Sequence, residues 1–189
     1  MAPAATPGAG AATAVLSFWF EETKPHQWYR RDPDFDQTVR QRFAALHEDA
    51  RAGRLGAWRG DETRALALII LLDQLSRNIF RDAPEAFAQD GQALNVAKDA
   101  IDRGFNLRFP EKQQAFFYMP FMHSETLSEQ DRCVALFTEH MPASDNLPFA
   151  VEHREIIVRF GRFPHRNKIL GRQSTPEEIS FLEAGGFNP

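Results

Sequence analysis

The sequence has very little cysteine and no long apolar run, and both absences narrow what the protein can be. Its 189 residues include a single cysteine, Cys133, so an internal disulfide framework is excluded. Cys133 opens the apolar stretch CVALF, which favours a buried small hydrophobic residue over a nucleophile. The most apolar run, residues 65–72, is ended by Asp73 and is far too short to span a bilayer. We expect it to form a buried helix instead.

Positive charge and targeting signals are also scarce. The chain carries 22 Lys and Arg against 26 Asp and Glu, a net charge of −4, which argues against general nucleic-acid binding. Its beginning, MAPAATPGAGAATA, has no basic region and no sustained apolar core, so it is not a convincing secretory signal. We expect residues 1–12 to form a flexible tail rich in Ala, Pro and Gly. The prediction is a cytoplasmic protein with no nucleic-acid or membrane partner.

Motifs for metals and nucleotides are missing too. The 6 histidines show no HExxH spacing, and the chain has no paired CxxC, EF-hand loop, Walker loop or dinucleotide fingerprint. We therefore predict no metal and no cofactor. A metal-assisted hydrolase stays open as an alternative, and it would need at least three of four side chains close together. These are His123, Glu125, His153 and His165.

Helical signals, by contrast, recur from end to end, and no segment alternates like a strand. Phenylalanine is abundant, with 17 copies, so large aromatic side chains should dominate the packing. Connections between the helical segments are short. The sequence predicts one all-α domain over residues 13–189, with seven to nine helices in antiparallel pairs and no internal boundary.

Capping residues mark where several of these helices should begin. Thr13 can cap a first short helix, and Asp32 precedes a proline at the first helical position. Asp61 can cap the helix that carries the apolar run. Ser128 and Thr175 each begin a capping-box pattern, with an acidic residue three positions later.

Polar side chains directly extend the apolar run, in the stretch DQLSRNIFR. Asp73 and Arg77 are four residues apart and can pair on one face. Gln74, Asn78 and Arg81 occupy the next face. Because a buried helix leads into them, some of these groups should enter the interior, where a charge needs a partner. An internal ion-pair network and part of a ligand site are both open interpretations.

A second polar cluster is YMPFMHSE, which begins with Tyr118. Pro120 should kink or break the helix here and turn the following side chains towards a cavity. His123 and Glu125 are the candidates for general acid–base catalysis, because a carboxylate can orient a histidine that titrates near neutrality. No nucleophile elbow surrounds Ser124. Helix-end capping with one satisfied histidine is the structural alternative.

The third cluster, RFGRFPHRN, interleaves arginines and a histidine with aromatic rings where a helix must stop. Between residues 151 and 172, six Lys or Arg oppose two Asp or Glu, an excess of four positive charges. Guanidinium forks suit carboxylate or phosphate, although they also satisfy helix C-terminal carbonyls. The candidate ligand-binding residues in and before this stretch are His153, Arg159, Arg162, His165, Arg166 and Asn167.

Two of these candidates have ordinary structural roles open to them as well. His153 follows Ala150 by three residues on an apolar helix face, where a satisfied core histidine is the common outcome. Arg159 follows Glu155 by four residues, a spacing that favours a surface ion pair. Such a pair contributes about 0.3–0.5 kcal/mol when exposed.

The blocks LSFWFEE, LALIILLDQLSRNIFRDAPEAFAQD, FYMPFMHSETLSEQ and FGRFPHRNKILGRQSTPEEISFL, in this order, resemble one bacterial family, domain of unknown function 924. The resemblance runs from about Val15 to Phe187. It implies a tetratricopeptide-like all-α superhelix, and it brings no established activity. One departure is Leu75–Ser76, where the family has Phe-Pro, and a proline there would kink the helix.

Two further hypotheses stand beside the hydrolase. In the first, the three polar clusters meet in a pocket that binds a small anionic molecule, with or without catalysis. In the second, the protein is a helical adaptor whose groove accepts a peptide or protein partner through exposed aromatics such as Trp28, Tyr29 or Trp58. The residues decide neither the substrate nor the oligomeric state.

Overall fold

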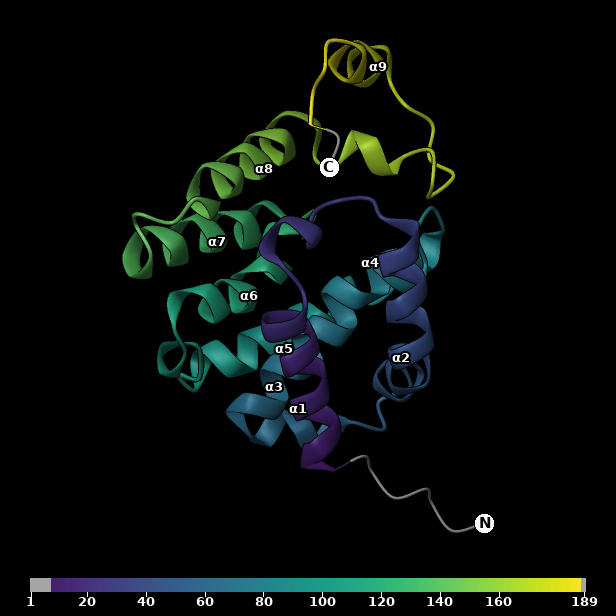
Figure 1. The fold of residues 1–189 in the computed structure, drawn as a ribbon. Helices are drawn as coiled ribbons and strands as arrows, with labels where there is room; N and C mark the ends of the chain where they lie inside the picture. The colour runs from purple at the N-terminus through teal and green to yellow at the C-terminus, as the bar shows by residue number, and fades with distance from the viewer. Residues whose placement is uncertain (1–7, 188–189) are drawn as a thin grey trace. The chain divides into compact units, whose positions relative to one another are not determined.

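The computed structural model describes residues 8–187, and these residues form helices and helical turns joined by short loops (Figure 1). No strand occurs in this range, so the predicted all-α class is confirmed. Within it, every helix is too short or too polar to cross a bilayer. The helices are α1 (Ala9–Ser17), α2 (Pro33–Arg51), α3 (Glu62–Ile69), α4 (Ser76–Ile79), α5 (Asp90–Asp102), α6 (Glu111–Met122), α7 (Leu127–His140), α8 (Asn146–Phe160) and α9 (Pro176–Glu183).

These helices belong to two compact units, each described by itself. The N-terminal unit contains the chain up to residue 81 together with residues 85–120, and the C-terminal unit contains residues 82–84 and the chain from 121 onward. The break falls at Pro120, inside α6. Because a helix runs through this boundary, no linker composition marks it in the sequence.

The core of the N-terminal unit is the apolar run that the sequence singled out. Residues 65–72 are all buried, in α3 and in the π-helical segment Ile70–Leu75 that continues it. Helix α3 packs against α1 and α5. Burying each large aliphatic side chain of such a run contributes about 2 kcal/mol. The expectation of a central buried helix is therefore confirmed.

Three predicted helix caps are confirmed. The Asp32 carboxylate accepts the backbone N–H groups of Asp34 and Phe35 at 3.0 and 3.1 Å. The Asp61 carboxylate accepts a backbone N–H in the first turn of α3 at 2.9 Å. Thr175 forms a reciprocal capping box at the start of α9. Each cap satisfies donors that a helix end leaves unpaired.

Two other expected helix starts are wrong. Helix α1 begins at Ala9 rather than at Thr13, because the alanines of this stretch have high helix propensity. Residues 9–12 of the predicted tail are thus helical, and residues 1–7 lie outside the described range. Helix α7 begins at Leu127, after Thr126, and no side chain caps it, so Ser128 lies inside the helix.

The predicted break at Pro120 is also wrong. Helix α6 continues through Pro120 to Met122. A proline inside a helix removes one hydrogen bond and crowds the preceding turn. Here the aromatic neighbours Phe117 and Phe121 are fully buried, and their packing offsets that loss.

The C-terminal unit is built on a helical hairpin. Helices α7 and α8 pack side by side and are joined by the short connection 141–145 (Figure 1). Gly161 ends α8 in the left-handed conformation, with φ +67°. The chain then makes a short turn and returns through α9, which packs against that turn. The RFGRFPHRN stretch therefore lies between two helices of one unit.

Candidate functional site

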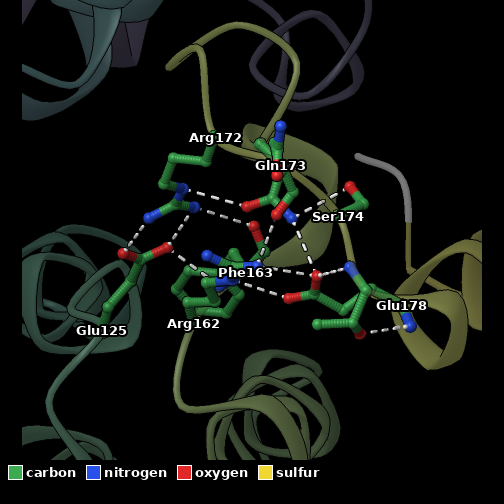
Figure 2. Close-up of polar contacts among 9 residues, drawn as sticks. Glu125, Arg162, Phe163, Arg172, Gln173, Ser174 and Glu178 are labelled. Carbon is green, nitrogen blue, oxygen red and sulfur yellow. Dashed lines mark hydrogen bonds and ion pairs between the residues drawn. The ribbon is translucent and has the colours of Figure 1, made fainter.

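Glu125, from the second polar cluster, contacts the segment that contains the third. Its carboxylate receives two hydrogen bonds from Arg172, at 2.6 and 2.9 Å, and the backbone N–H of Phe163 at 2.8 Å (Figure 2). Burial alone would raise the pKa of Glu125, but the hydrogen bonds from Arg172 and Phe163 outweigh it and lower that pKa. Glu125 is therefore an ionised carboxylate in an ion pair with Arg172.

Arg162 is held in the same way by Glu178 of α9. The guanidinium donates to the two carboxylate oxygens at 2.6 and 2.8 Å and to the carbonyl oxygen of Gln173 at 2.8 Å (Figure 2). The backbone N–H of Thr175 donates to Glu178 at 2.7 Å. The hydrogen bond from Arg162 is the main reason that the pKa of Glu178 falls to about 2.

Asn167 joins these two ion pairs into one network. Its side-chain oxygen accepts from Arg172 at 2.9 Å, and its amide nitrogen donates to Glu178 at 3.2 Å and to Ser174 at 3.1 Å. Asn167 is fully buried. The residues of this carboxylate–arginine network are Glu125, Arg162, Asn167, Arg172 and Glu178. It fixes the RFGRFPHRN segment between the loop after α6 and helix α9.

The local excess of positive charge is balanced by carboxylates from other segments. Arg159 pairs with Glu177 at 2.9 Å rather than with the predicted Glu155, which contacts Arg154 instead at 3.1 Å. Arg154 also pairs with Asp131 at 2.6 Å. Four arginines of residues 151–172 thus face carboxylates outside that window: Arg154, Arg159, Arg162 and Arg172. The charge excess seen in the sequence is therefore not evidence for a ligand by itself.

Two histidines, His153 and His165, lie against Phe163 and Phe187 in the same unit, and His123 lies beside His153. The His153 ring centroid lies 6.4 Å from that of His123, 5.5 Å from Phe163 and 4.4 Å from Phe187. His165 lies 5.6 Å from Phe163 and 5.5 Å from Phe187. We call these five residues the imidazole–phenyl cluster. His123 and His165, which come from separate sequence motifs, both belong to this cluster through their ring contacts.

A guanidinium borders this cluster. The Arg166 Cζ lies 4.6 Å from the centroid of the Phe163 ring, a cation–π distance, and Arg166 is only 6% exposed. Its charge contributes to the lowered pKa of Glu125. His153 Nδ1 lies 2.7 Å from the Phe149 carbonyl oxygen, so Nδ1 carries the hydrogen and Nε2 is the basic nitrogen. The expectation that His153 is a satisfied, buried histidine is confirmed.

The first polar cluster lies in the N-terminal unit. The predicted pair of Asp73 and Arg77 is confirmed, with 3.2 Å between the charged atoms. Arg77 also makes a two-pronged contact with Asp90, at 3.0 and 3.1 Å. Gln74 donates to Asp73 at 2.6 Å. These contacts match the ion-pair interpretation of this stretch.

Asn78 and Arg81 share one partner that sequence reasoning missed. Both donate to the carboxylate of Asp36, Asn78 at 2.8 Å and Arg81 through Nη2 at 2.7 Å. Asp36 is 6% exposed on α2. It directly follows Phe35, a buried aromatic residue of the same helix, and this position was the available signal.

Tyr118, in the same unit, is hydrogen-bonded to two side-chain amides. The sequence gave no reason to select either of them. The Tyr118 hydroxyl accepts from Asn106 at 2.9 Å and from Gln114 at 2.6 Å. A further unforeseen pair joins His47 and Ser76, with 2.7 Å between Nε2 and Oγ. Ser76 stands where the resemblance led us to expect proline. Burial lowers the pKa of His47 to about 4, so this histidine is neutral at pH 7.

The structure also describes the residues of the remaining alternatives, and Tyr29 of the adaptor hypothesis is 60% exposed, as expected. Within residues 8–187, no group of three His, Cys, Asp or Glu side chains is arranged to hold a metal ion, so the hydrolase lacks its donor set. Cys133 is buried, and burial raises its pKa to about 12. The adaptor hypothesis named Trp58 as exposed, which is wrong because Trp58 is fully buried. Trp28 is half-buried and donates to the Trp19 carbonyl oxygen at 3.0 Å.

Comparison with known proteins agrees with the resemblance seen in the sequence. A family described as bacterial protein of unknown function (DUF924) matches residues 15–186. The chain belongs to the DUF924 family. It is also similar to a solved structure, the protein of unknown function ATU0120 from Agrobacterium tumefaciens. The identity is 40% and the TM-score 0.89, over 94% of this chain and 99% of that one. No curated protein matches the chain.

The DUF924 match contains all three polar clusters, and the solved relative extends the fold assignment beyond a sequence pattern. The tetratricopeptide-like superhelix stays a prediction. Membership in DUF924 brings no activity with it. Any statement about function must therefore rest on the side chains described above.

Proposed function

We propose that this protein binds a small anionic molecule at the imidazole–phenyl cluster, with Arg166 as the principal cation. The observation that carries the proposal is that the imidazoles of His153 and His165 and the guanidinium of Arg166 lie against Phe163, with the His123 ring beside that of His153. A guanidinium has five N–H donors, so Arg166 can hold neighbouring groups and a ligand at once. The imidazoles add ring N–H donors.

The same geometry narrows the original set of candidate residues. Arg162 and Asn167 belong to the carboxylate–arginine network, and Arg159 has a partner on the surface. The contacts of these three residues support a structural role for them better than contact with a ligand. The proposal therefore concentrates on His123, His153, His165 and Arg166. It includes binding and no reaction, with Glu125 as the ion-pair partner of Arg172.

Thermal unfolding in the presence of a panel of anions tests this proposal. The panel is acetate, citrate, benzoate and inorganic phosphate at constant ionic strength and pH 6.5. At a concentration about 100 times its Kd, a ligand of the native state raises Tm by about 5 °C or more. We expect at least one anion to do this for the wild type.

Two substitutions connect that shift to the site. Arg166→Gln should abolish the anion-dependent rise in Tm, whereas Arg159→Gln, a half-exposed arginine on the same segment, should keep it. His165→Gln serves as a second site variant if Arg166→Gln does not fold, and it should reduce the rise. An equal response in wild type and both site variants, or no response of the wild type, would overturn the proposal.

A further inference from the structure

The connection between α1 and α2 carries an excess of positive charge. Residues 23–31, TKPHQWYRR, include Lys24, Arg30 and Arg31 and contain no Asp or Glu. Asp32, the next residue, is occupied as the cap of α2, where its carboxylate accepts two backbone N–H groups. The segment is therefore basic within a chain whose net charge is −4.

Trp28 is the aromatic centre of this segment. Its ring stacks on that of the fully buried Trp19, with centroids 5.9 Å apart, and its Nε1 donates to the Trp19 carbonyl oxygen at 3.0 Å. Lys112, in the first turn of α6, has its Nζ 5.2 Å from the Trp28 centroid, a cation–π distance. Tyr29 meets the Trp28 ring edge to face at 6.2 Å and is 60% exposed. An anchored tryptophan thus holds an exposed aromatic ring and a lysine close together.

Hydrogen bonds fix the backbone that leads to Trp28. The Lys24 N–H donates to the side-chain oxygen of Gln27 at 2.9 Å, and the Trp28 N–H donates to the carbonyl oxygen of Pro25 at 3.3 Å. These bonds close a short helical turn just before the exposed side chains. Because the turn is already ordered, little conformational entropy is lost when a partner binds it.

Three exposed cations at this connection are left without an ion pair. Within residues 8–187, none of Lys24, Arg30 and Lys112 pairs with a carboxylate. Arg42 and Arg77 of the same unit, by contrast, both do. The unpaired cations lie in the segment that contains Trp28 or directly on its ring. A partner that supplies carboxylates would complement all three of them.

From this arrangement we propose that residues 24–31, together with Lys112, dock an acidic peptide segment of a partner protein. Carboxylates of the peptide pair with Lys24, Arg30 and Lys112, and an apolar side chain packs on the exposed ring of Tyr29. Aromatic and arginine side chains that are held in place are the usual hot spots of such interfaces. The inference is independent of the anion site, because all of its residues belong to the N-terminal unit.

Nucleic acids and anionic membranes are also attracted to basic residues. A long polyanion or a charged membrane meets a large part of the protein surface, where the net charge of −4 opposes it. A short acidic peptide meets only the basic segment, since charges beyond about 10 Å are screened. The charge distribution therefore favours a peptide as the occupant.

Fluorescence anisotropy with a labelled ten-residue peptide of glutamate and leucine, blocked at both ends, tests the proposal. The comparison peptide has glutamine in place of every glutamate. At an ionic strength of about 50 mM, the wild type should bind the acidic peptide at least tenfold more tightly, and added salt should reduce the difference. Equal binding of the two peptides would overturn the proposal. So would tighter binding of a ten-nucleotide single-stranded DNA or of phosphatidylserine vesicles than of the acidic peptide.

Charge substitutions connect that binding to the segment. Lys112→Gln should weaken binding of the acidic peptide by about threefold, and adding Lys24→Gln and Arg30→Gln should weaken it by about tenfold or more. Lys168→Gln is the matched control, because it removes the same charge from another exposed lysine, in the C-terminal unit, and it should leave the affinity unchanged. Equal losses in Lys112→Gln and Lys168→Gln would show that only net charge matters, which contradicts a docking surface.

The aromatic part has a test of its own. Tyr29→Ala should weaken binding of the acidic peptide by about fivefold or more. Phe149→Ala, which removes a ring that is 52% exposed on α8, should not change it. Tyr29→Gln replaces Tyr29→Ala if the latter does not fold, and the same loss is expected. Full affinity without the Tyr29 ring would count against the proposal.

Arg166→Gln distinguishes failure of this inference from failure of the anion site. It should abolish the response to small anions and leave peptide binding unchanged. If Arg166→Gln loses the peptide while Lys112→Gln keeps it, the peptide binds at the anion site and the docking surface is contradicted. If small anions do not bind but the peptide does so in a Lys112-dependent manner, the docking surface stands alone.

Discussion

Glu178 is a buried carboxylate that its hydrogen-bond partners keep ionised. It is 2% exposed, and it accepts hydrogen bonds from Arg162, Asn167 and the backbone of Thr175. These contacts lower its pKa from 4.5 to about 2. In the unfolded chain the carboxylate binds its proton more readily. Its contribution to stability is therefore complete above pH 4.5 and is lost as the pH falls towards 2.

Glu178→Gln should lower the free energy of unfolding by about 2–3 kcal/mol at pH 7, because it leaves the Arg162 guanidinium without its carboxylate. It should also flatten the dependence of stability on pH below 4.5. Urea denaturation at several pH values measures both effects.

The neighbouring Glu177→Gln is the control for that substitution. Its side chain is 62% exposed in its ion pair with Arg159, so it should cost less than about 0.5 kcal/mol. Similar losses in the two variants would show that burial and the network do not distinguish Glu178.

His47 also contributes stability that is lost on acidification, in this case because its neutral form is the one buried. It is 1% exposed beside Ser76, and burial lowers its pKa from 6.5 to about 4. The unfolded chain takes up this proton first on acidification. Stability should consequently fall by about 2–3 kcal/mol as the pH drops from 6.5 to 4.

His47→Gln should remove most of that dependence, whatever it does to stability at pH 7. Guanidinium chloride titrations at pH 7, 6, 5 and 4 give the slope. His26→Gln, which alters an exposed histidine, should keep the wild-type slope. A slope that persists in His47→Gln would contradict this assignment.

The sequence was enough to select Asp73, Arg77 and Arg162 as polar side chains at positions where apolar ones are expected. It did not identify their partners. The reason is physical: Arg162 reaches Glu178 sixteen residues away, and Arg81 reaches Asp36 on another helix, 45 residues away. Such distances depend on tertiary packing, and only local pairs such as Asp73 and Arg77 follow from helical spacing.

Helix caps were predictable because each depends on a few adjacent residues. Asp32, Asp61 and Thr175 show this. The π-helical segments Phe18–Glu22 and Ile70–Leu75 were not predictable. A π-helical turn differs from an α-helical turn by one residue and has no composition of its own. The continuation of α6 through Pro120 likewise depended on buried aromatic packing that local rules do not contain.

The two helix glycines Gly161 and Gly91 should respond oppositely to alanine. Neither position has an atom within 4 Å of an added Cβ, so sterics with neighbours do not differ. Gly161 has φ +67° at the end of α8, and Gly161→Ala should cost about 1 kcal/mol. Gly91 lies within α5 in an exposed position, and Gly91→Ala should add about 0.5 kcal/mol. Urea midpoints of the two variants on the same side of the wild type would contradict this account.

Over the described chain as a whole, charge is organised mainly by pairing. In the N-terminal unit the carboxylate of Asp36 accepts hydrogen bonds from Asn78 and Arg81. In the C-terminal unit Glu125 pairs with Arg172, and Glu178 pairs with Arg162. The DUF924 match over residues 15–186 includes all of these residues. The functional proposal concerns the imidazole–phenyl cluster and Arg166 beside it.

The most direct measurement is side-chain NMR of the chain's 6 histidines during titration with benzoate and, separately, with inorganic phosphate. We predict that benzoate moves the imidazole resonances of His123, His153 and His165. The resonances of His26, His47 and His140 should stay in place. If the first three do not respond to either anion, or if the changes are confined to the other three, the proposed site is contradicted.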